Sequence, residues 1–587
     1  MIFHNGTLIT IEESQPLAEA IALRNGLIQA VGTNTEILAL QGPDTQVIDL
    51  DGHTMMPGFI DGHTHILAFP GRMGRSLDEA QDIALQYGFT GVTEMWANED
   101  VVRSFLIAEN DGKLRLRVNV FPSYNDGILG SDRRRILMET WYPAHAPILD
   151  PGRLVRIPGI KIFVDGDNAS YERGCWALSK PFEAGAPILS RGVCGTDRGD
   201  LYWSQDELNR VVKQAQEAGY RVAFHAMGDR AIDTALNTIE YALNGASNEI
   251  VRHQIEHNSL TRTDQLERYA ALDVAVSVRG YGVTWCDAGS LKKPFGEDRY
   301  LWYFNRFALA GMDIHAYVET DFGWTVDPED RFAARSLDPM VQLYGIVTHK
   351  FIMPDGTICE PGPLAPDLPI SIERGLQMLT IEPAYAVSME DYIGSLKAGK
   401  YGDLIVLSGN PLGVDPDELK NLQVWMTMVA GKVEYCATGQ EALCPGEHAV
   451  ENLPSSGNLA LNQIATASMS LQNSPDMAVD GDESTYWGAG DFAPQRIEVD
   501  LGAPATITEI HLLVGQSPDG DTQHRILAGE TSSDLNEIHI FDQFTHDGEW
   551  LVFQPQAPLE PIQFIRVETL ASPSWVAWFE IQVFGTR

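Results

Sequence analysis

The chain has 587 residues, of which 44% are hydrophobic and 9% aromatic, so it is a globular protein too long for a single hydrophobic core. It carries 81 acidic and 41 basic side chains, and its formal net charge of −40 makes nucleic acid and anionic membranes poor partners. No run of about 18 apolar residues occurs, so we expect no membrane-spanning helix.

Short strands are predicted in two parts of the chain that lie far apart in sequence. Residues 1–56 contain three apolar stretches with Asn-Gly or Asp-Gly hairpin signals, but too few residues to close a core alone. Glycine turns separate further strand-like stretches in GSLKAGKYGDLIVL (394–407) and VWMTMVAGKVEY (424–435). We therefore expect one small composite β-domain, made of residues 1–57 and 386–440.

The segment PGFIDGHTHI (57–66) is an apolar run that ends in His63 and His65. Side chains two residues apart in a strand point to the same face, so both imidazoles are expected at one strand end. Two imidazoles on one rigid element suit a divalent metal such as zinc. The alternative is an incidental pair of surface histidines, because an H-x-H pattern alone is a weak signal.

Residues 58–385 alternate between strand-like and helix-like segments. Ser204 and Glu207 have the spacing of a capping box, and apolar residues then recur at helical spacing. A strand–helix–strand rhythm of this length predicts a parallel sheet. Further candidate side chains follow in later strands: Lys161 lies within IKIFVDG, and His225, His257 and Asp321 each stand at the end of a strand.

Four of these segments, PGFIDGHTHI, IKIFVDG, HAMGDRA and GSLKAGKYGDLIVL, resemble the amidohydrolase superfamily. Of these, IKIFVDG and HAMGDRA resemble in particular amidohydrolase family 3 and its N-substituted formamide deformylase-like branch. The resemblance implies a multidomain α/β fold: a (β/α)8 TIM barrel over residues 58–385, joined to the composite β-domain. Active-site groups then belong at the C-terminal ends of the barrel strands.

The resemblance also implies a metal site. Its ligands would be His63, His65, Lys161, His225, His257 and Asp321. Four imidazoles can serve one or two Zn²⁺ ions or another divalent transition metal. A binuclear metal centre needs a bridging anion, and a carboxylated lysine at Lys161 is the candidate, because a buried amine with a lowered pKa can take up CO₂. The alternative for Lys161 is an ordinary salt bridge beside a single metal.

Asp321 is the implied catalytic residue. It would take a proton from a metal-activated water and later protonate the leaving nitrogen. The branch usually has Gly-Ser-Asp at this point, whereas this chain has Glu-Thr-Asp followed by Phe-Gly-Trp. We therefore expect a different pocket beside Asp321. Glu94 is expected as a solvated carboxylate at a strand end, the alternative being a place in the lining of the pocket. His253 is expected as a core histidine. Five aromatic residues have two alternative interpretations: they form an aromatic wall for a bulky apolar substrate, or they only pack the loops. They are Tyr281, Trp285, Trp302, Phe322 and Trp324.

A linker rich in proline, glycine and serine is expected over residues 441–457, and residues 458–587 read as alternating strands. NLALNQIATAS, AVDGDESTYWGAG and WFEIQVFG resemble the discoidin (coagulation-factor C-type) family. The resemblance implies an all-β sandwich with a structural calcium site, Ca²⁺ being held by Asp480, Thr485 and Glu580. It also implies a glycan or surface ligand, and assembly into a homo-oligomer is a further alternative. Trp575 is a candidate platform for a sugar, whereas Trp578 is expected in the core.

Six cysteines are present without a C-x-x-C spacing, so we expect free or buried thiols in a cytoplasmic protein. Cys436 and Cys444 would pair only in an oxidising compartment. The first residues read as a strand rather than as a secretion signal, which favours the same location.

The function predicted from these resemblances is hydrolysis of a non-peptide C–N bond in a small-molecule N-acyl or N-formyl amide. One alternative is an esterase, lactonase or carbamate hydrolase with the same metal centre. Another is a non-catalytic binding protein that carries a glycan-binding module.

Overall fold

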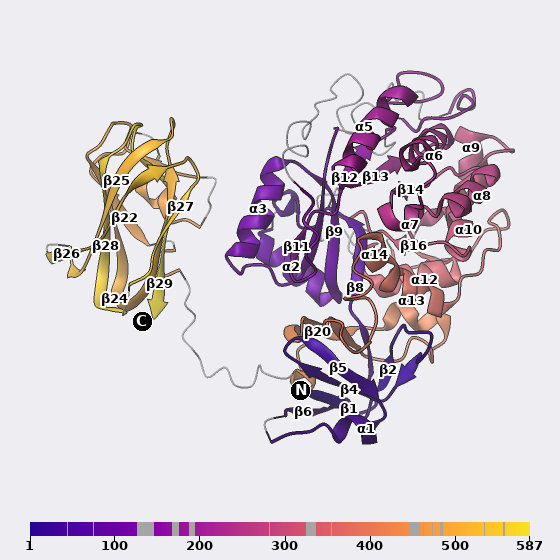
Figure 1. Ribbon diagram of the computed structural model, residues 1–587, viewed down its shortest axis with the longest axis horizontal. Helices are drawn as coiled ribbons and strands as arrows, with labels where there is room; N and C mark the ends of the chain where they lie inside the picture. The colour runs from indigo at the N-terminus through magenta and orange to yellow at the C-terminus, as the bar shows by residue number, and fades with distance from the viewer. Residues whose placement is uncertain are drawn as a thin grey trace. The chain divides into compact units, whose positions relative to one another are not determined.

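A computed structural model describes the fold of this chain (Figure 1). The described residues are 1–43, 45–73, 75–125, 146–166, 175–186, 194–280, 282–323, 336–353, 355–444, 458–461, 463–471, 473–481, 485–532, 534–555 and 558–586. The chain divides into two units, Met1–Glu447 and His448–Arg587. The predicted linker lies largely outside the described residues, and the predicted domain boundaries stay predictions.

Strands from both ends of the first unit share one sheet. That sheet has the order β21-β20-β19-β7-β2-β3, and a second sheet has the order β5-β4-β1-β6. The strands are β1 (Ile2–His4), β2 (Thr7–Ile9), β3 (Leu17–Ala18), β4 (Ala20–Arg24), β5 (Leu27–Gly32), β6 (Val47–Asp49), β7 (Thr54–Pro57), β19 (Leu404–Leu407), β20 (Val424–Val429) and β21 (Lys432–Cys436). The antiparallel pairing of β7 with β19 creates the composite small β-domain.

Parallel strands form the centre of the first unit. One sheet has the order β11-β10-β9-β8, and the other has the order β12-β13-β14-β15-β16. Their bounds are β8 (Phe59–Thr64), β9 (Phe89–Ala97), β10 (Arg117–Pro122), β11 (Val155–Arg156), β12 (Gly159–Phe163), β13 (Arg221–Ala226), β14 (Gln254–His257), β15 (Ala275–Val278) and β16 (Ala316–Val318).

Backbone hydrogen bonds link these two sheets at both junctions. The amide of Tyr124, just after β10, donates to the carbonyl of Lys161 in β12 at 2.8 Å. The amide of Asp321, just after β16, donates to the carbonyl of His63 in β8 at 2.9 Å, and the amide of His65 donates to Phe322 at 2.7 Å. β11 and β12 are separated by only two residues and both lie beside the β10 segment, so they act as one interrupted strand. The nine strands therefore correspond to the eight parallel strands of a TIM barrel.

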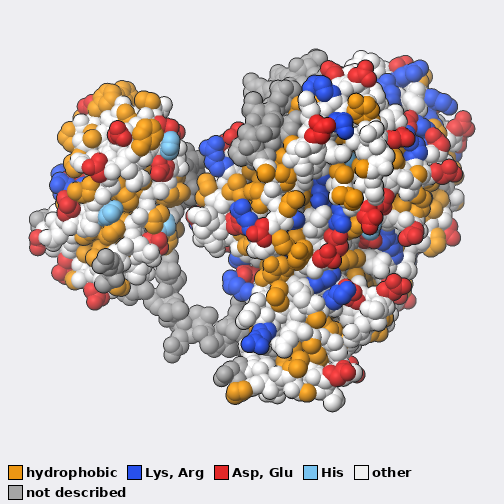
Figure 2. All heavy atoms as spheres, in the orientation of Figure 1, with side chains coloured by type: hydrophobic (Ala, Val, Ile, Leu, Met, Phe, Trp, Pro, Cys, Tyr) orange, Lys and Arg blue, Asp and Glu red, His pale blue; other side chains and the backbone are white. Residues whose placement is uncertain are grey.

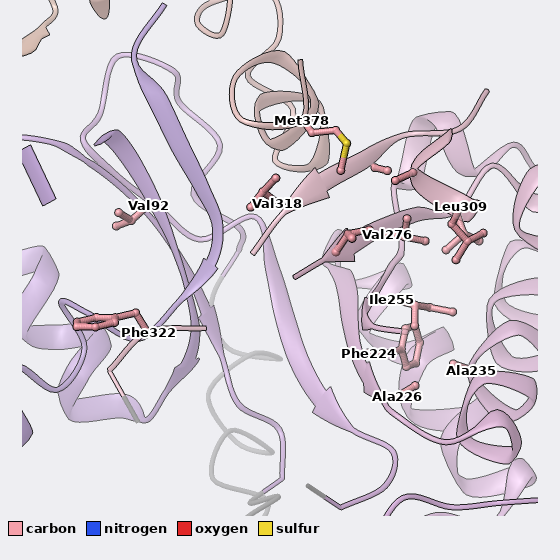
Figure 3. Packing of buried hydrophobic residues seen from close by; sticks show 14 of the residues in the cluster. Val92, Phe224, Ala226, Ala235, Ile255, Val276, Leu309, Val318, Phe322 and Met378 are labelled. Atoms are coloured by element: carbon pink, nitrogen blue, oxygen red, sulfur yellow. The ribbon is translucent and has the colours of Figure 1, made fainter. Parts of the chain in front are cut away.

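Helices cover the outside of these strands. They are α2 (Leu77–Gln86), α3 (Glu99–Asn110), α5 (Gln205–Glu217), α6 (Asp229–Leu243), α7 (Asn248–Val251), α8 (Thr263–Leu272), α9 (Lys292–Phe295), α10 (Asn305–Gly311), α12 (Pro339–Thr348), α13 (Ile372–Met378) and α14 (Ile381–Ala386). Helix α1 (Asn34–Leu38) packs instead on the small β-domain, where its Ile37 lies against Ile2 and Ala22. The predicted capping box is confirmed, with the Ser204 side chain accepting from the amide of Glu207. Figure 3 shows Phe224 and Ile255 on neighbouring strands, packed towards Ala235 of α6 and Leu309 of α10. The outward side chains of the strands and the inner faces of the helices therefore form one core.

A buried ion pair joins the barrel to the small β-domain. Nε of Arg117 in β10 lies 2.6 Å from Oδ2 of Asp403, and both side chains are less than 5% exposed. Asp403 Oδ1 also accepts from the amide of Ala430 at 2.7 Å. The aspartate of GSLKAGKYGDLIVL thus fixes the turn before β19 against the base of the barrel.

The prediction of free thiols is wrong, because the six cysteines form three disulfides and none is free. The pairs are Cys175–Cys194, Cys286–Cys359 and Cys436–Cys444. Cys359 belongs to a short hairpin of β17 (Phe351–Ile352) and β18 (Ile358–Cys359). The first two pairs span 19 and 73 residues, so the fold and not a local spacing brings them together.

The second unit is all-β. Its strands are β22 (Ile464–Ala467), β23 (Trp487–Gly488), β24 (Gln495–Gly515), β25 (Gly520–Thr531), β26 (Asp534–Thr545), β27 (Trp550–Phe553), β28 (Leu559–Ala571) and β29 (Ala577–Thr586). The long strand β24 pairs with both β28 and β29. Trp487 and Trp578 are buried in the core, which confirms the prediction for Trp578, whereas Trp575 is exposed.

The surface carries acidic and basic side chains side by side. Figure 2 shows acidic groups scattered over the visible face of each unit rather than gathered in one patch. Among the described helices, none combines the length and the apolar character that a membrane crossing requires.

Candidate metal centre and active site

The structure brings five of the six predicted site residues into one ring of contacts. The His63 ring lies 5.4 Å from the His65 ring and 4.6 Å from the His257 ring, and His225 lies 4.7 Å from His257. Asp321 approaches the first two histidines through one oxygen. These residues come from the C-terminal ends of β8, β13 and β14 and from the segment after β16, where a TIM barrel places its active site.

Asp321 Oδ1 is shared between two imidazoles. It lies 3.6 Å from His63 Nε2 and 3.2 Å from His65 Nε2. These three atoms are close enough together to bind one metal ion. The side chains of His63, His257 and Glu319 form a second group whose ligand atoms are equally close. Imidazole nitrogens with one carboxylate oxygen are a suitable ligand set for zinc.

Lys161 occupies the same buried space. Burial lowers the pKa of the Lys161 amine to about 8. The nearby carboxylates of Glu256, Asp321 and Glu319 raise this pKa, but their effect is smaller than that of burial. Within the described part of the chain, Nζ of Lys161 and Nε2 of His225 have no hydrogen-bond partner although both are buried. Buried polar atoms without partners are uncommon, and here they fit a site that holds a divalent cation.

Two carboxylates that the sequence analysis missed stand behind the histidines. Glu256 Oε2 lies 2.9 Å from His63 Nδ1, and Glu319 Oε1 lies 2.9 Å from His257 Nδ1. Tyr317 donates a hydrogen bond of 2.6 Å to the other oxygen of Glu256. A carboxylate on Nδ1 holds the proton there and leaves Nε2 of the ring for a metal. The only local signal was that each acid stands one or two residues before a predicted ligand.

Left-handed backbone at two positions helps to assemble the site. His257 has φ 72° and Asp321 has φ 50°. Neighbours in a regular strand point to opposite faces, yet Glu256 and His257 both reach His63. The turn at His257 removes that alternation, and such strained residues concentrate at functional sites.

Burial keeps most of the imidazoles neutral, the form that binds metals. It lowers the pKa of His65, and it lowers the pKa of His63 and of His225 well below the usual range. His257 differs: burial lowers its pKa, but the charge and hydrogen bond of Glu319 outweigh this and raise it.

Arg279 was also missed by the sequence analysis. It follows β15, and its Nη2 pairs with Oδ2 of Asp321. Burial raises the pKa of Asp321, but Arg279, then His65 and His257, outweigh it and hold the pKa well below the usual range. Asp321 is therefore an ionised carboxylate between two histidines and a guanidinium.

Other buried acids fix the loops around the site. The prediction for Glu94 is wrong, because its side chain is buried and accepts from the amide of Leu67 at 2.6 Å. The loop after β8 therefore covers the end of β9, which the sequence analysis expected to be exposed to solvent. Asp165 accepts from the amides of Ala177, Met227 and Gly228, which ties the chain after β12 to the turn after β13.

The remaining predictions have mixed outcomes. His253 is a core histidine as predicted, with Nδ1 accepting from the amide of Val222 at 3.0 Å. Trp285 is fully buried and stacks on His349, so for this residue loop packing is right and the aromatic wall is wrong. Tyr281 and Trp324 lie outside the described residues.

The predicted calcium ligands of the second unit lie together. Thr485 donates to Asp480 at 2.9 Å, and the amide of Gly481 donates to the buried Glu580 at 3.3 Å. Carboxylate and hydroxyl oxygens suit calcium, and the calcium site stays a prediction.

The fold and the ring of histidines define a protein of the amidohydrolase type. Residues 71–435 match the amidohydrolase family, and residues 463–581 match the F5/8 type C domain. The chain therefore belongs to the amidohydrolase family and carries a C-terminal F5/8 type C (discoidin) domain. His63 and His65 precede the matched range, so their assignment stands on the geometry.

The chain is similar to several known proteins. It is 27% identical over 248 residues to an N-substituted formamide deformylase of Arthrobacter pascens, covering 42% of each chain. It is 24% identical over 287 residues to the putative amidohydrolase YtcJ of Bacillus subtilis, covering 48% of each chain. These alignments span about half the length of those relatives. The fold is similar to an uncharacterized metal-dependent hydrolase from Pyrococcus horikoshii, with a TM-score of 0.55, 20% identity and coverage of 71% of this chain and 98% of that one.

Proposed function

We propose that this protein is a metal-dependent hydrolase that acts on a non-peptide C–N bond, in an N-acyl or N-formyl amide. The observation that carries the proposal is the sharing of Asp321 Oδ1 between His63 and His65 inside a ring of buried histidines. Family membership and the similarity to a formamide deformylase of Arthrobacter pascens support it.

The residues that would hold the metal are His63, His65, His225, His257 and Asp321. Zn²⁺ fits this donor set, in one or two copies. Lys161 would carry a carbamate that bridges two ions, since its buried amine has a pKa of about 8 and takes up CO₂ more readily than an ordinary lysine. A divalent metal bound there supplies Lewis-acid chemistry, because it polarises a carbonyl and lowers the pKa of water.

The side chains of the site then divide the remaining work. Asp321 accepts the proton of the attacking water at Oδ1 and returns it to the leaving nitrogen. Arg279 and the two histidines hold that carboxylate ionised and in place. Glu256 and Glu319 hold the protons of His63 and His257 on Nδ1.

Hydrolysis of an ester, a lactone or a carbamate uses the same groups, and this remains the alternative within the same chemistry. The experiment is to prepare the protein free of metal, reload it with Zn²⁺, and assay matched amide, formamide, ester, lactone and carbamate substrates. We expect the amides to be hydrolysed fastest, and only by the loaded protein.

Two variants complete this experiment. Asp321→Asn should lower kcat about 10²- to 10⁴-fold, as expected for loss of a general acid–base. Asp313→Asn is the matched control, because Asp313 is exposed and precedes β16, the strand that Asp321 follows. Failure to bind metal together with no hydrolysis of any substrate would instead favour a non-catalytic binding protein.

For the C-terminal unit we propose binding of a glycan or surface ligand. A cavity of about 420 Å³ is lined by aromatic side chains, among them Phe492 and Trp575, which are 53% and 49% exposed. Exposed aromatic rings offer an apolar face to a sugar ring. Trp575→Ala should abolish retention on immobilised glycans without changing hydrolysis.

The alternative role of this unit is assembly into a homo-oligomer. Light scattering after removal of residues 458–587 tests it: loss of the oligomer would support this role, and an unchanged oligomer would exclude it.

The predicted cytoplasmic location is opposed by the three disulfides. Disulfides persist in oxidising compartments and are rare in the cytosol. We therefore infer an oxidising compartment for this protein. Mass spectrometry of the protein isolated from its own cells, alkylated before lysis, tests this inference, and six alkylated cysteines would overturn it.

A further inference from the structure

Phe163 is an aromatic side chain inside the proposed metal centre. It is the last residue of β12 and follows Lys161 by two positions, and side chains two residues apart in a strand share one face. The centre of the Phe163 ring lies 5.6 Å from Nζ of Lys161 and 4.9 Å from the centre of the His225 ring. The ring therefore lies against two residues of the metal centre.

Phe163 is also nearer to the mouth of the barrel than these two residues. Lys161 is 1% exposed, His225 is 4% exposed and Phe163 is 7% exposed. The amide of Phe163 donates to Oδ1 of Asn125 at 2.9 Å, and its carbonyl accepts from Nε1 of Trp203 at 2.7 Å. These two hydrogen bonds hold the backbone that carries the ring in place.

Asp321 lies on the other side of the site. It follows β16, the eighth strand of the barrel, whereas β12 belongs to the fourth, and these two strands are the opposite ends of one five-stranded sheet. In a closed barrel of eight strands, the fourth and the eighth face each other across the centre. A substrate held between the histidines therefore has Asp321 on one side and Phe163 on the other.

The proton transfer gives the substrate its direction. This step rests on the proposed function, in which water adds its oxygen to the acyl carbon, the C–N bond breaks and Asp321 returns the proton to the leaving nitrogen. That nitrogen must lie within hydrogen-bond reach of Asp321. The acyl carbon stands between the nitrogen and the acyl substituent, so the substituent extends away from Asp321 and towards Phe163.

We propose that Phe163 is a specificity-determining residue that limits the size of the acyl group. Its ring occupies the space into which an acyl chain extends. A formyl group carries only a hydrogen atom at this point and fits beside the ring. A longer chain collides with the ring, because closely packed side chains leave no room for extra methylene groups. The site therefore selects N-formyl amides over amides of longer acids.

The test uses two amides of the same amine, N-benzylformamide and N-benzylbutyramide. The formamide is intrinsically the more reactive, so each variant loaded with Zn²⁺ is compared with the wild-type protein through the ratio of the two kcat/KM values. Phe163→Ala should lower the formamide-to-butyramide ratio about 10- to 100-fold, the discrimination that a pocket wall gives between substrates that differ in methylene groups. The change should come from faster hydrolysis of the butyramide.

A purely structural role of Phe163 predicts a different result. If the ring only packs on Lys161 and His225, Phe163→Ala slows both substrates equally and leaves the ratio unchanged, which would overturn the proposal. Phe163→Leu should lower the ratio by a smaller factor, and it carries the test if the alanine variant does not fold. Phe105→Ala is the matched control, because Phe105 is a buried phenylalanine of α3 on the outside of the barrel. It should leave the ratio unchanged.

A binding measurement keeps this inference separate from the proposed function. Formohydroxamate and butyrohydroxamate bind a metal through the same two oxygens and differ only in the acyl group. By calorimetry, Phe163→Ala loaded with Zn²⁺ should bind butyrohydroxamate about tenfold more tightly than the wild-type protein does, with little change for formohydroxamate. If neither amide is hydrolysed but this gain is found, the proposed function fails and the role of Phe163 stands. Equal affinities of the two proteins for butyrohydroxamate would reject the role of Phe163, whatever the hydrolysis assay gives.

Discussion

Nδ1 of His63 lies 2.9 Å from Oε2 of Glu256, so that a hydrogen bond crosses the barrel from β8 to β14. Both side chains are almost completely buried. Glu256 is in turn held by Tyr317 and Gln254, at 2.6 and 2.9 Å. This chain of contacts fixes the orientation of the His63 ring and directs Nε2 to Asp321, which is the arrangement that metal-binding histidines usually have.

Glu256→Gln should therefore weaken metal binding without unfolding the barrel. An amide keeps the shape of the side chain but holds the Nδ1 proton of His63 less firmly, and loss of such a partner typically costs 10- to 100-fold in metal affinity. Competition with a chromophoric chelator measures the Zn²⁺ affinity. Glu267→Gln on the outer surface of α8 is the control, and equal affinities for both variants would remove Glu256 from the metal site.

Lys161 should carry a carbamate when the protein is loaded with metal. Burial lowers the pKa of its amine to about 8, so a larger fraction is neutral at pH 8 than for an exposed lysine. Protein loaded in ¹³C-bicarbonate should give one carbamate resonance in the NMR spectrum. Lys161→Arg should not give it. A spectrum without this resonance would favour the alternative of one metal beside an ordinary lysine.

The parts of the site that sequence predicts are those with a local pattern. Alternation in PGFIDGHTHI places His63 and His65 on one face, and the order of the strands places His225 and His257 at the same barrel end. Glu256 and Arg279 have no such pattern, because their contacts with His63 and Asp321 join residues 193 and 42 positions apart. They depend on which strands become neighbours around the barrel.

The same reason explains two wrong predictions. Glu94 ends a strand and looked solvated, yet the loop that follows β8 covers it and donates an amide to it. The cysteines lack a metal-binding or redox spacing, but Cys286 and Cys359 meet across 73 residues of chain. Long-range packing decides burial and pairing, and a single sequence does not reveal it.

The buried pair of Arg117 and Asp403 should be sensitive to removal of one partner. Asp403→Asn leaves the guanidinium of Arg117 buried without a counter-charge, which we expect to lower the free energy of unfolding by about 3–5 kcal/mol. Urea titration measures this loss. The double change Arg117→Met with Asp403→Leu should recover part of it, since no buried charge remains but the amide of Ala430 loses its acceptor. Glu240→Gln, which breaks the exposed pair with Arg268, should cost about 1 kcal/mol or less.

His524 should make the C-terminal unit less stable in mild acid. Its side chain is buried, Nδ1 lies 3.1 Å from Thr569 Oγ1, and the ring contacts Trp578. Burial lowers the pKa of His524 to about 4 in the folded protein, against about 6.5 for an unfolded chain. Between these values the unfolded chain binds a proton that the folded chain does not. Stability therefore falls as the pH falls from 6.5 to 4, by at most about 1.4 kcal/mol per pH unit from this group.

Hydrogen exchange of peptides from β25 and β28, measured from pH 7 to pH 4 and corrected for the intrinsic rate, reports this loss. His524→Gln should flatten the dependence. His546→Gln is the control, because the pKa of His546 shifts in the opposite direction. The hydrogen bond to Asp519 raises the pKa of this exposed side chain, so His546 is protonated in both the folded and the unfolded state below pH 6.5. It therefore adds no pH dependence of stability in that range. An unchanged slope in His524→Gln, with the His524 ring seen by NMR to protonate near pH 6.5, would contradict the assignment.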